Sequence, residues 1–133
     1  MSKHERRDSE SVADMLARSR VVLDGHFLLT SGLHSPRYLE KFRLLQYPEY
    51  TGRLCGMVAE HFRGSGVEVV AGPALGGVIL AYEVARLLGV RAVYAERVGE
   101  GRGFRRGLSI ESGEKTLVVD DILTTGGLSL IHI

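Results

Sequence analysis

The sequence predicts an α/β protein built around a mainly parallel sheet, and three observations lead to this prediction. Short apolar runs at residues 67–71, 91–95 and 116–119 have the length and composition of buried strands. A helical pattern at residues 78–88 stands between the first two runs, and a glycine-rich turn at residues 72–77 precedes it. Strand, tight turn, helix and strand in this order are typical of parallel α/β units.

The residues before this unit predict two helices and a hairpin. Ser9 is placed to cap a helix that runs from residue 10 to about residue 20. Residues 25–30 and 37–42 are expected to be short strands on either side of a polar turn. The second helix is expected at residues 48–63, because Pro48 suits a first helical position and the run Gly64-Ser65-Gly66 stops the helix.

The helix at residues 78–88 is apolar almost all round, so we expect it to be deeply buried. Residues 96–107 form a charged, glycine-rich stretch, and residues 108–110 are expected to return as a strand. A chain of 133 residues suits a single domain, in which residues 1–8 would be frayed. In parallel sheets, ligands bind beyond the carboxyl ends of the strands, where the turn at 72–77 and the stretch at 96–107 lie.

Composition narrows the function classes. The formal net charge of +1 gives no basic field for a nucleic acid, so no nucleic-acid partner is expected. Neither a signal peptide nor a membrane span is visible, and we expect no membrane partner. Cys55 is the single cysteine, which excludes an internal disulfide and fits a reducing compartment. A soluble cytoplasmic protein is therefore the expectation, with Cys55 packed in the core.

The strongest local signal begins at the third predicted strand and runs to residue 127. Glycines let backbone N–H groups approach a phosphate, and threonine hydroxyls add donors. Two carboxylates directly upstream accept hydrogen bonds from ribose hydroxyls. The acids, threonines and glycines concerned are Asp120, Asp121, Thr124, Thr125, Gly126 and Gly127. The alternative is a polar turn without a ligand, whereas the patterns of nucleoside triphosphate and dinucleotide loops are absent from the sequence.

The same segment resembles the phosphoribosyl pyrophosphate signature of type I phosphoribosyltransferases. Within that family, residues 25–38 resemble the N-terminal substrate segment of orotate phosphoribosyltransferases. Residues 72–77 are similar to their pyrophosphate loop, and the helix after it to the helix that follows that loop. Glu96-Arg97 and residues 105–107 resemble the two ends of their mobile catalytic loop. The resemblance covers about residues 13–127 and implies the type I phosphoribosyltransferase fold, a parallel Rossmann-like sheet flanked by helices with a small N-terminal hood.

The resemblance also implies an activity. Members transfer the phosphoribosyl group from phosphoribosyl pyrophosphate to orotate, which gives orotidine 5′-monophosphate and pyrophosphate. Magnesium accompanies the pyrophosphate, so no residue of the chain is assigned as a metal ligand. Family members pair as homodimers. By resemblance, the catalytic residues are Asp120, Asp121, Arg97 and Arg102.

Binding roles follow from the same resemblance. The residues expected to bind phosphoribosyl pyrophosphate are Asp120, Asp121, Thr124, Thr125, Gly126, Gly127, Ala74, Leu75, Gly76, Arg97, Arg105 and Arg106. The residues expected to contact orotate are Thr30, Tyr38, Leu39 and Thr124. The arginine-rich stretch would be a flexible lid that excludes water, and its alternative is a solvated basic hairpin.

The chain departs from the family pattern in several places. Thr30 stands where many relatives carry lysine, and Leu39 and Gly76 replace an aromatic residue and a lysine of some members. Residues 128–133 form an atypical tail, and we expect that the C-terminal part of the core is missing. Three other functions stay open: a purine-type phosphoribosyltransferase, a regulatory protein that binds phosphoribosyl pyrophosphate, and a nonfunctional fragment.

Overall fold

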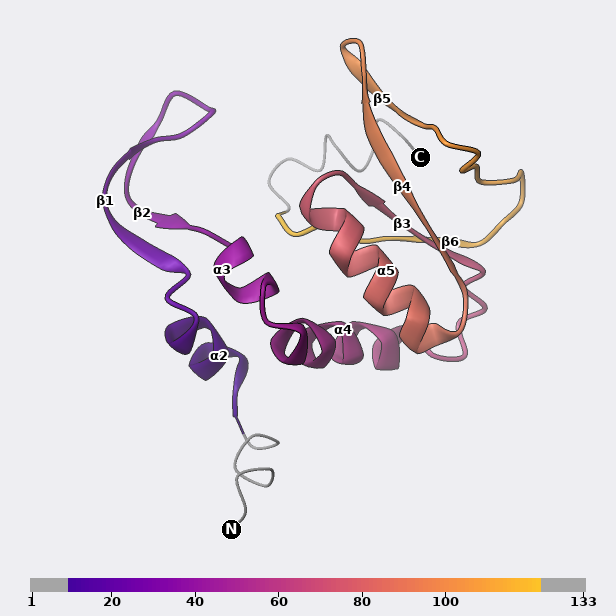
Figure 1. Ribbon diagram of the computed structural model, residues 1–133, viewed down its shortest axis with the longest axis horizontal. Coiled ribbons are helices and arrows are strands. Elements are labelled where there is room, and N and C mark those ends of the chain that lie inside the picture. Colours follow the sequence, from indigo (N-terminus) through magenta and orange to yellow (C-terminus); the bar gives the residue numbers. More distant parts are fainter. Residues whose placement is uncertain (1–9, 123–133) are drawn as a thin grey trace. The chain divides into compact units, whose positions relative to one another are not determined.

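The computed structural model describes residues 10–122, which belong to two compact units (Figure 1). The N-terminal unit is Met1–Thr51 and the C-terminal unit is Gly52–Ile133. The frayed start and the atypical tail that the sequence predicts lie outside the described residues. None of the helices in residues 10–122 is both long and apolar enough to cross a lipid bilayer.

The first helix of the N-terminal unit, α2, spans Val12–Arg18 and begins at a capping box. The Asp14 amide donates to Ser11 Oγ at 3.2 Å, and the Ser11 amide donates to Asp14 Oδ2 at 3.0 Å. The N-cap is therefore Ser11 and not Ser9 as predicted, because the Ser-x-x-Asp spacing satisfies two backbone donors at once. Met15 is the buried residue of this helix.

A hairpin follows in the N-terminal unit. Its strands β1 (Val22–Leu28) and β2 (His34–Leu39) pair antiparallel, with an irregularity between Asp24 and Phe27. Both strands begin three residues earlier than the sequence predicts. The short helix α3 (Phe42–Leu45), which the sequence analysis missed, buries Leu44 and Leu45.

The second predicted helix is confirmed as α4, which spans Pro48–Phe62. Its residues in the C-terminal unit include Cys55 and Ala59, which are buried in the main apolar cluster of that unit. Burial raises the pKa of the Cys55 thiol to about 11, and the Glu83 carboxylate adds a smaller increase. The thiol thus stays protonated near neutral pH, which agrees with the predicted packing role.

The C-terminal unit contains a four-stranded sheet in the order β5-β4-β3-β6. Its parallel strands are β3 (Val69–Pro73), β4 (Arg91–Val98) and β6 (Thr116–Val118). The edge strand β5 (Gly101–Phe104) runs antiparallel to β4 and forms a hairpin with it (Figure 1). The predicted parallel α/β core is therefore confirmed.

Helix α5 (Gly76–Leu88) packs against β3 and β4. Its buried residues Ala81, Val84 and Ala85 share the apolar cluster with Val70 and Cys55. The prediction that this helix is buried all round is wrong, because Ile79 and Tyr82 are 40% and 69% exposed. One face of the helix meets the sheet, and a helix of this kind needs only that stripe to be apolar.

The other face of the sheet carries a second apolar cluster formed by Val69, Ala71 and Val93. Leu108 and Ile110 pack against it, but residues 108–110 are not a strand as predicted. Their alternating apolar side chains cover the sheet from an extended segment whose backbone joins no strand pair. The alternation of apolar and polar residues predicts which side chains pack on the sheet, but it does not predict the partners of the backbone hydrogen bonds.

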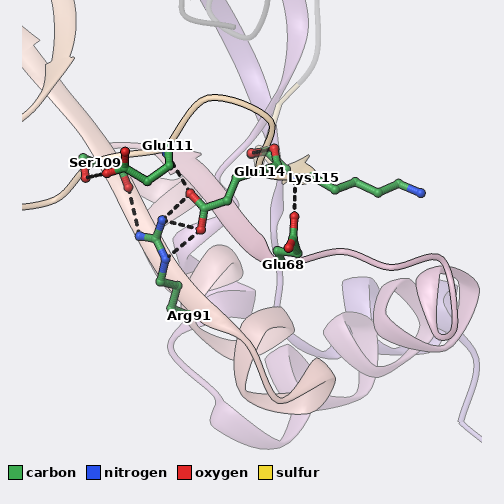
Figure 2. Close-up of polar contacts among 7 residues, drawn as sticks. Glu68, Arg91, Ser109, Glu111, Glu114 and Lys115 are labelled. Atoms are coloured by element: carbon green, nitrogen blue, oxygen red, sulfur yellow. Dashed lines mark hydrogen bonds and ion pairs between the residues drawn. The ribbon is translucent and has the colours of Figure 1, made fainter.

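A polar clamp at the amino ends of the strands holds this covering segment (Figure 2). Arg91, the first residue of β4, donates from Nη2 to Glu114 Oε1 at 2.7 Å and from Nη1 to the Ser109 carbonyl at 2.9 Å. The Lys115 amide donates to Glu68 Oε2 at 2.8 Å, which ties the start of β6 to that of β3. The clamp thereby fixes the middle and the C-terminal end of the connection between the hairpin and β6.

We expect Arg91→Gln to lower the thermal unfolding midpoint near neutral pH. The hydrogen bond from Arg91 holds the pKa of Glu114 below its ordinary value of 4.5. A carboxyl group with a lowered folded pKa stabilises the fold above its unfolded pKa and loses this effect as pH falls through the folded value. The difference between the parent and the variant should therefore shrink below about pH 4.5.

The measurement is thermal unfolding followed by circular dichroism at neutral pH and near pH 3. The matched control is Arg63→Gln, because Arg63 pairs with Glu60 on the exposed side of α4, where side chains of both residues are more than half exposed. Exposed pairs of this kind contribute little. Equal effects of the two substitutions at neutral pH would contradict the clamp.

Candidate functional site

The turn between β3 and α5 is the tightest approach of backbone to backbone around the candidate site. A Cβ atom added to Gly72 would lie 2.1 Å from the carbonyl oxygen of Gly77, and one added to Gly77 would lie 2.6 Å from Pro73 Cδ. Glycine is therefore required at both positions for steric reasons. The family resemblance implies roles for Ala74, Leu75 and Gly76 in this turn, and the structure adds Gly72 and Gly77 as residues that the turn requires.

The turn is anchored to the neighbouring strand and hairpin through Ala74. Its amide donates to the Ala95 carbonyl at 2.8 Å, and its carbonyl accepts from Arg102 Nη1 at 2.8 Å. The next peptide bond, between Ala74 and Leu75, is cis, and Leu75 is 72% exposed. The backbone of the turn is thus fixed while Leu75 stays open to solvent.

The predicted lid contains a hairpin, so its central part is regular structure. Arg97 and Arg102 are direct cross-strand partners, as are Ala95 and Phe104. Because every second residue of a strand points to the same face, these four side chains share one face of the hairpin. Phe104 packs on the cluster around Val93, so Arg97 and Arg102 continue that face past the carboxyl end of the sheet. The Arg102 guanidinium donates to the Ala74 carbonyl, and Arg97 lies directly across the strand pair from Arg102.

Arg106 lies in a different environment from this arginine pair. Its Nε lies 3.2 Å from Glu96 Oε2, and its φ of 60° places it in the left-handed region. Glu96 is the neighbour of Arg97 in β4, so its side chain leaves the strand on the opposite face. Arg105 is exposed. The structure therefore separates the four predicted arginines into a pair at the turn and a pair at the base of the hairpin.

Both predicted acids follow β6 at the same edge of the sheet as the turn. Pairing of β6 with β3 continues to the Val119 amide, which donates to the Ala71 carbonyl at 2.9 Å. The carboxylate of Asp121 then lies against Gly76, where an added Cβ would be 1.8 Å from its Oδ2. The turn and the acids, which are far apart in the sequence, are in contact.

The surroundings of Asp120 disfavour its charged form. Burial raises the pKa of Asp120 above its ordinary value of 3.8, and the neighbouring Asp121 carboxyl raises it further. The Asp121 amide donates to Asp120 Oδ1 at 2.8 Å. Two partly buried carboxyl groups at a sheet edge favour a ligand that supplies hydrogen-bond donors or positive charge.

The three predicted orotate contacts that are described belong to the N-terminal unit. Tyr38 and Leu39 are the last residues of β2, and Thr30 lies in the loop between the strands. Neighbouring strand residues point to opposite faces, so a flat ligand on one face would meet the side chain of Tyr38 or of Leu39 and not both. Tyr38 is 39% exposed, and its ring centroid lies 5.6 Å from that of Phe27.

Thr124, Thr125, Gly126 and Gly127, which were predicted to hold the 5′-phosphate, lie outside the described residues. Within residues 10–122, the structure brings no group of three or more histidine, cysteine or acidic side chains together as a metal site.

Two curated relatives of the chain are both orotate phosphoribosyltransferases. The chain is 48% identical over 118 residues to the orotate phosphoribosyltransferase of Desulforamulus reducens, which covers 89% of this chain and 62% of the relative. It is 49% identical over 120 residues to that of Chlorobaculum parvum, which covers 90% of this chain and 62% of the relative. The chain thus spans about 62% of the length of these curated relatives. A comparison with models of protein families gives no match.

Solved structures show the same fold. Orotate phosphoribosyltransferase from Aeropyrum pernix is 26% identical, with a TM-score of 0.69 over 91% of this chain and 70% of that one. UMP synthase from Leishmania donovani has a TM-score of 0.74 at 24% identity, over 90% of this chain and 26% of that one. Adenine phosphoribosyltransferase from Giardia lamblia has a TM-score of 0.67 at 24% identity, over 92% of this chain and 74% of that one. The predicted type I phosphoribosyltransferase fold is confirmed.

We expect Gly72→Ala to destabilise the fold by about 2 kcal/mol or more, because the new methyl group would meet the Gly77 carbonyl. The matched control is Gly56→Ala in α4, where an added Cβ would meet no atom within 4 Å and alanine favours the helix. Urea unfolding of both variants provides the measurement. Equal stability of the two variants would contradict the close approach in the turn.

Proposed function

Because this chain is a homologue of orotate phosphoribosyltransferases, with their fold, we propose that it transfers the 5-phosphoribosyl group from phosphoribosyl pyrophosphate to orotate. The products are orotidine 5′-monophosphate and pyrophosphate, and the reaction belongs to UMP synthesis. The observation that supports the proposal is that Asp121, which follows Asp120, contacts the same glycine turn to which Arg102 donates a hydrogen bond. We propose the activity for the whole protein, since the chain spans about 62% of its relatives.

In this proposal, the turn and the arginine pair bind the pyrophosphate group. Backbone amides of Ala74, Leu75 and Gly76 donate to its oxygens, and Arg97 and Arg102 supply positive charge from the hairpin. Guanidinium groups keep their charge and match phosphate oxygens in pairs. Negative charge that develops on the leaving group is therefore met by fixed donors. Arg105 and Arg106 add charge at the base of the hairpin.

The acids act on the sugar. Asp120 and Asp121 accept hydrogen bonds from the ribose hydroxyls, which orients the ring beside the turn. As the bond from C1 to the pyrophosphate breaks, positive charge grows on the ribose. Carboxylates at this edge stabilise that charge. In turn, a positively charged neighbour would stabilise the ionised form of Asp120, whose pKa is raised by burial and by Asp121.

Magnesium fits this donor set. Asp120 and Asp121 offer carboxylate oxygens, the ligands that Mg²⁺ prefers, and the ion commonly shares one or two carboxylates with phosphate oxygens of a substrate. When bound with phosphoribosyl pyrophosphate, Mg²⁺ would neutralise charge on the leaving group.

The remaining contacts are proposals from the sequence resemblance. Thr124, Thr125, Gly126 and Gly127 hold the 5′-phosphate. Orotate lies against Tyr38, with Thr30 and Thr124 as further contacts, whereas Leu39 follows Tyr38 in β2 and points to the opposite face. We also propose a cytoplasmic location, which the single, buried cysteine fits. From the resemblance we further propose a homodimer.

A purine-type phosphoribosyltransferase is the second candidate, because adenine phosphoribosyltransferases share the fold at TM-scores such as 0.67. Sequence identity favours orotate as the base. The chain is 48% identical to the orotate phosphoribosyltransferase of Desulforamulus reducens, but 24% identical to the adenine phosphoribosyltransferase of Giardia lamblia.

We expect orotate absorbance to fall when the whole protein is mixed with Mg²⁺, phosphoribosyl pyrophosphate and orotate, because the base is converted to its nucleotide. Parallel reactions with adenine and hypoxanthine in place of orotate discriminate the candidates. Consumption of a purine and not of orotate would favour the purine-type enzyme. Binding of phosphoribosyl pyrophosphate without consumption of any base would favour the regulatory protein.

We expect Asp120→Asn to weaken the binding of phosphoribosyl pyrophosphate about 10- to 100-fold, which corresponds to the loss of a hydrogen bond to a charged acceptor. Isothermal titration calorimetry in the presence of Mg²⁺ measures the affinity. Glu60→Gln on α4 is the control, because it makes the same carboxylate-to-amide change at a side chain that is 74% exposed. An unchanged affinity in the Asp120 variant would remove this residue from the proposed site.

A further inference from the structure

We propose that Asp121 is a positioning residue for the pyrophosphate turn, in addition to any contact with the sugar. Its carboxylate packs against Gly76 and so couples the sugar-binding acids to the turn between β3 and α5. The inference rests on the proposed function, because it assigns how two parts of the same site depend on one another.

The contact itself is close. A Cβ atom added to Gly76 would lie 1.8 Å from Asp121 Oδ2 and 2.4 Å from Asp121 Cγ. Real Cβ contacts are not found at such distances, so the carboxylate occupies the volume that a side chain at position 76 would need. This explains why position 76 is glycine, and why a long side chain there is incompatible with this placement of Asp121.

The chemistry of the contact is favourable. Gly76 is the first residue of α5, whose N-cap, Leu75, makes no side-chain hydrogen bond, and the first turn contains no acidic residue. The amino end of a helix carries partial positive charge from its unpaired amides. The Asp121 carboxylate brings negative charge to this helix end from another strand of the sheet.

The turn is thus held from two sides. On one side, the Ala74 amide donates a hydrogen bond to the Ala95 carbonyl, and the Ala74 carbonyl accepts one from Arg102. On the other side, Asp121 contacts Gly76, and the adjacent Asp120 is the acid proposed for the ribose. Removal of the Asp121 side chain leaves the turn supported from the hairpin side alone. The turn amides would then lose alignment for pyrophosphate even though no pyrophosphate contact has been deleted.

We expect Asp121→Ala to weaken the binding of inorganic pyrophosphate by about tenfold or more in calorimetry, both with and without Mg²⁺, which corresponds to about 1.4 kcal/mol. A loss that occurs only with Mg²⁺ would assign Asp121 to the metal and overturn the positioning role. Asp121→Asn keeps the shape of the side chain and should lose no more than about fivefold, the size of a charge effect at a helix end. Glu60→Ala on α4 is the control for deletion of an acid and should leave the affinity unchanged.

A double-mutant cycle tests the contact without any ligand. Gly76→Ala should lower the unfolding midpoint of the parent chain but have a much smaller effect in the Asp121→Ala background, where the nearest remaining side-chain atom is Cβ at 3.1 Å. Gly56→Ala, whose added Cβ meets nothing within 4 Å, should have the same effect in both backgrounds.

The outcomes of these experiments distinguish a failure of the inference from a failure of the proposed function. If the parent binds neither pyrophosphate nor phosphoribosyl pyrophosphate, the proposed function fails and the inference fails with it. If the parent binds both and Asp121→Ala keeps its pyrophosphate affinity, the inference alone is wrong. Additive effects of Gly76→Ala and Asp121→Ala on stability would also overturn it, because residues in contact must be coupled.

Discussion

The close approach within the turn between β3 and α5 is the constraint on which the site depends. Gly72 and Gly77 let strand and helix backbones come nearer than any side chain would permit. This approach directs the start of α5 towards the segment after β6, and it leaves room for a carboxylate at Gly76. A larger residue at any of these glycines would push apart the groups that the site requires together.

The register of the hairpin strands β4 and β5 determines the positions of Arg97 and Arg102. Pairing of Arg97 with Arg102 follows from the pairing of Ala95 with Phe104, and Phe104 is held by the apolar cluster around Val93. Packing in the sheet therefore determines which face of the hairpin carries the guanidinium groups. A shift of one residue would turn both arginines away from Ala74.

Much of this arrangement could be predicted from the sequence, because buried strands and the glycine turn have strong local signatures. The acids after β6 were found because they follow an apolar strand directly. The contact between Asp121 and Gly76 depends on strand order, which no local pattern encodes. Residues 108–110 were mistaken for a strand because their apolar alternation is the same whether the backbone pairs or only covers a sheet. The short helix α3 has too few residues for a periodic signal.

The position of β6 in the sheet has a consequence for how the protein assembles. β3, α5 and β4 are consecutive along the chain, so their pairing closes short loops, whereas β6 joins β3 only after the hairpin and the covering segment have been traversed. Longer loops cost more entropy to close. The acids should then arrive beside the glycine turn late in folding, and a sugar diphosphate that bridges both would trap the completed sheet. A ligand that contacts both parts of the site would in this way also stabilise the folded sheet.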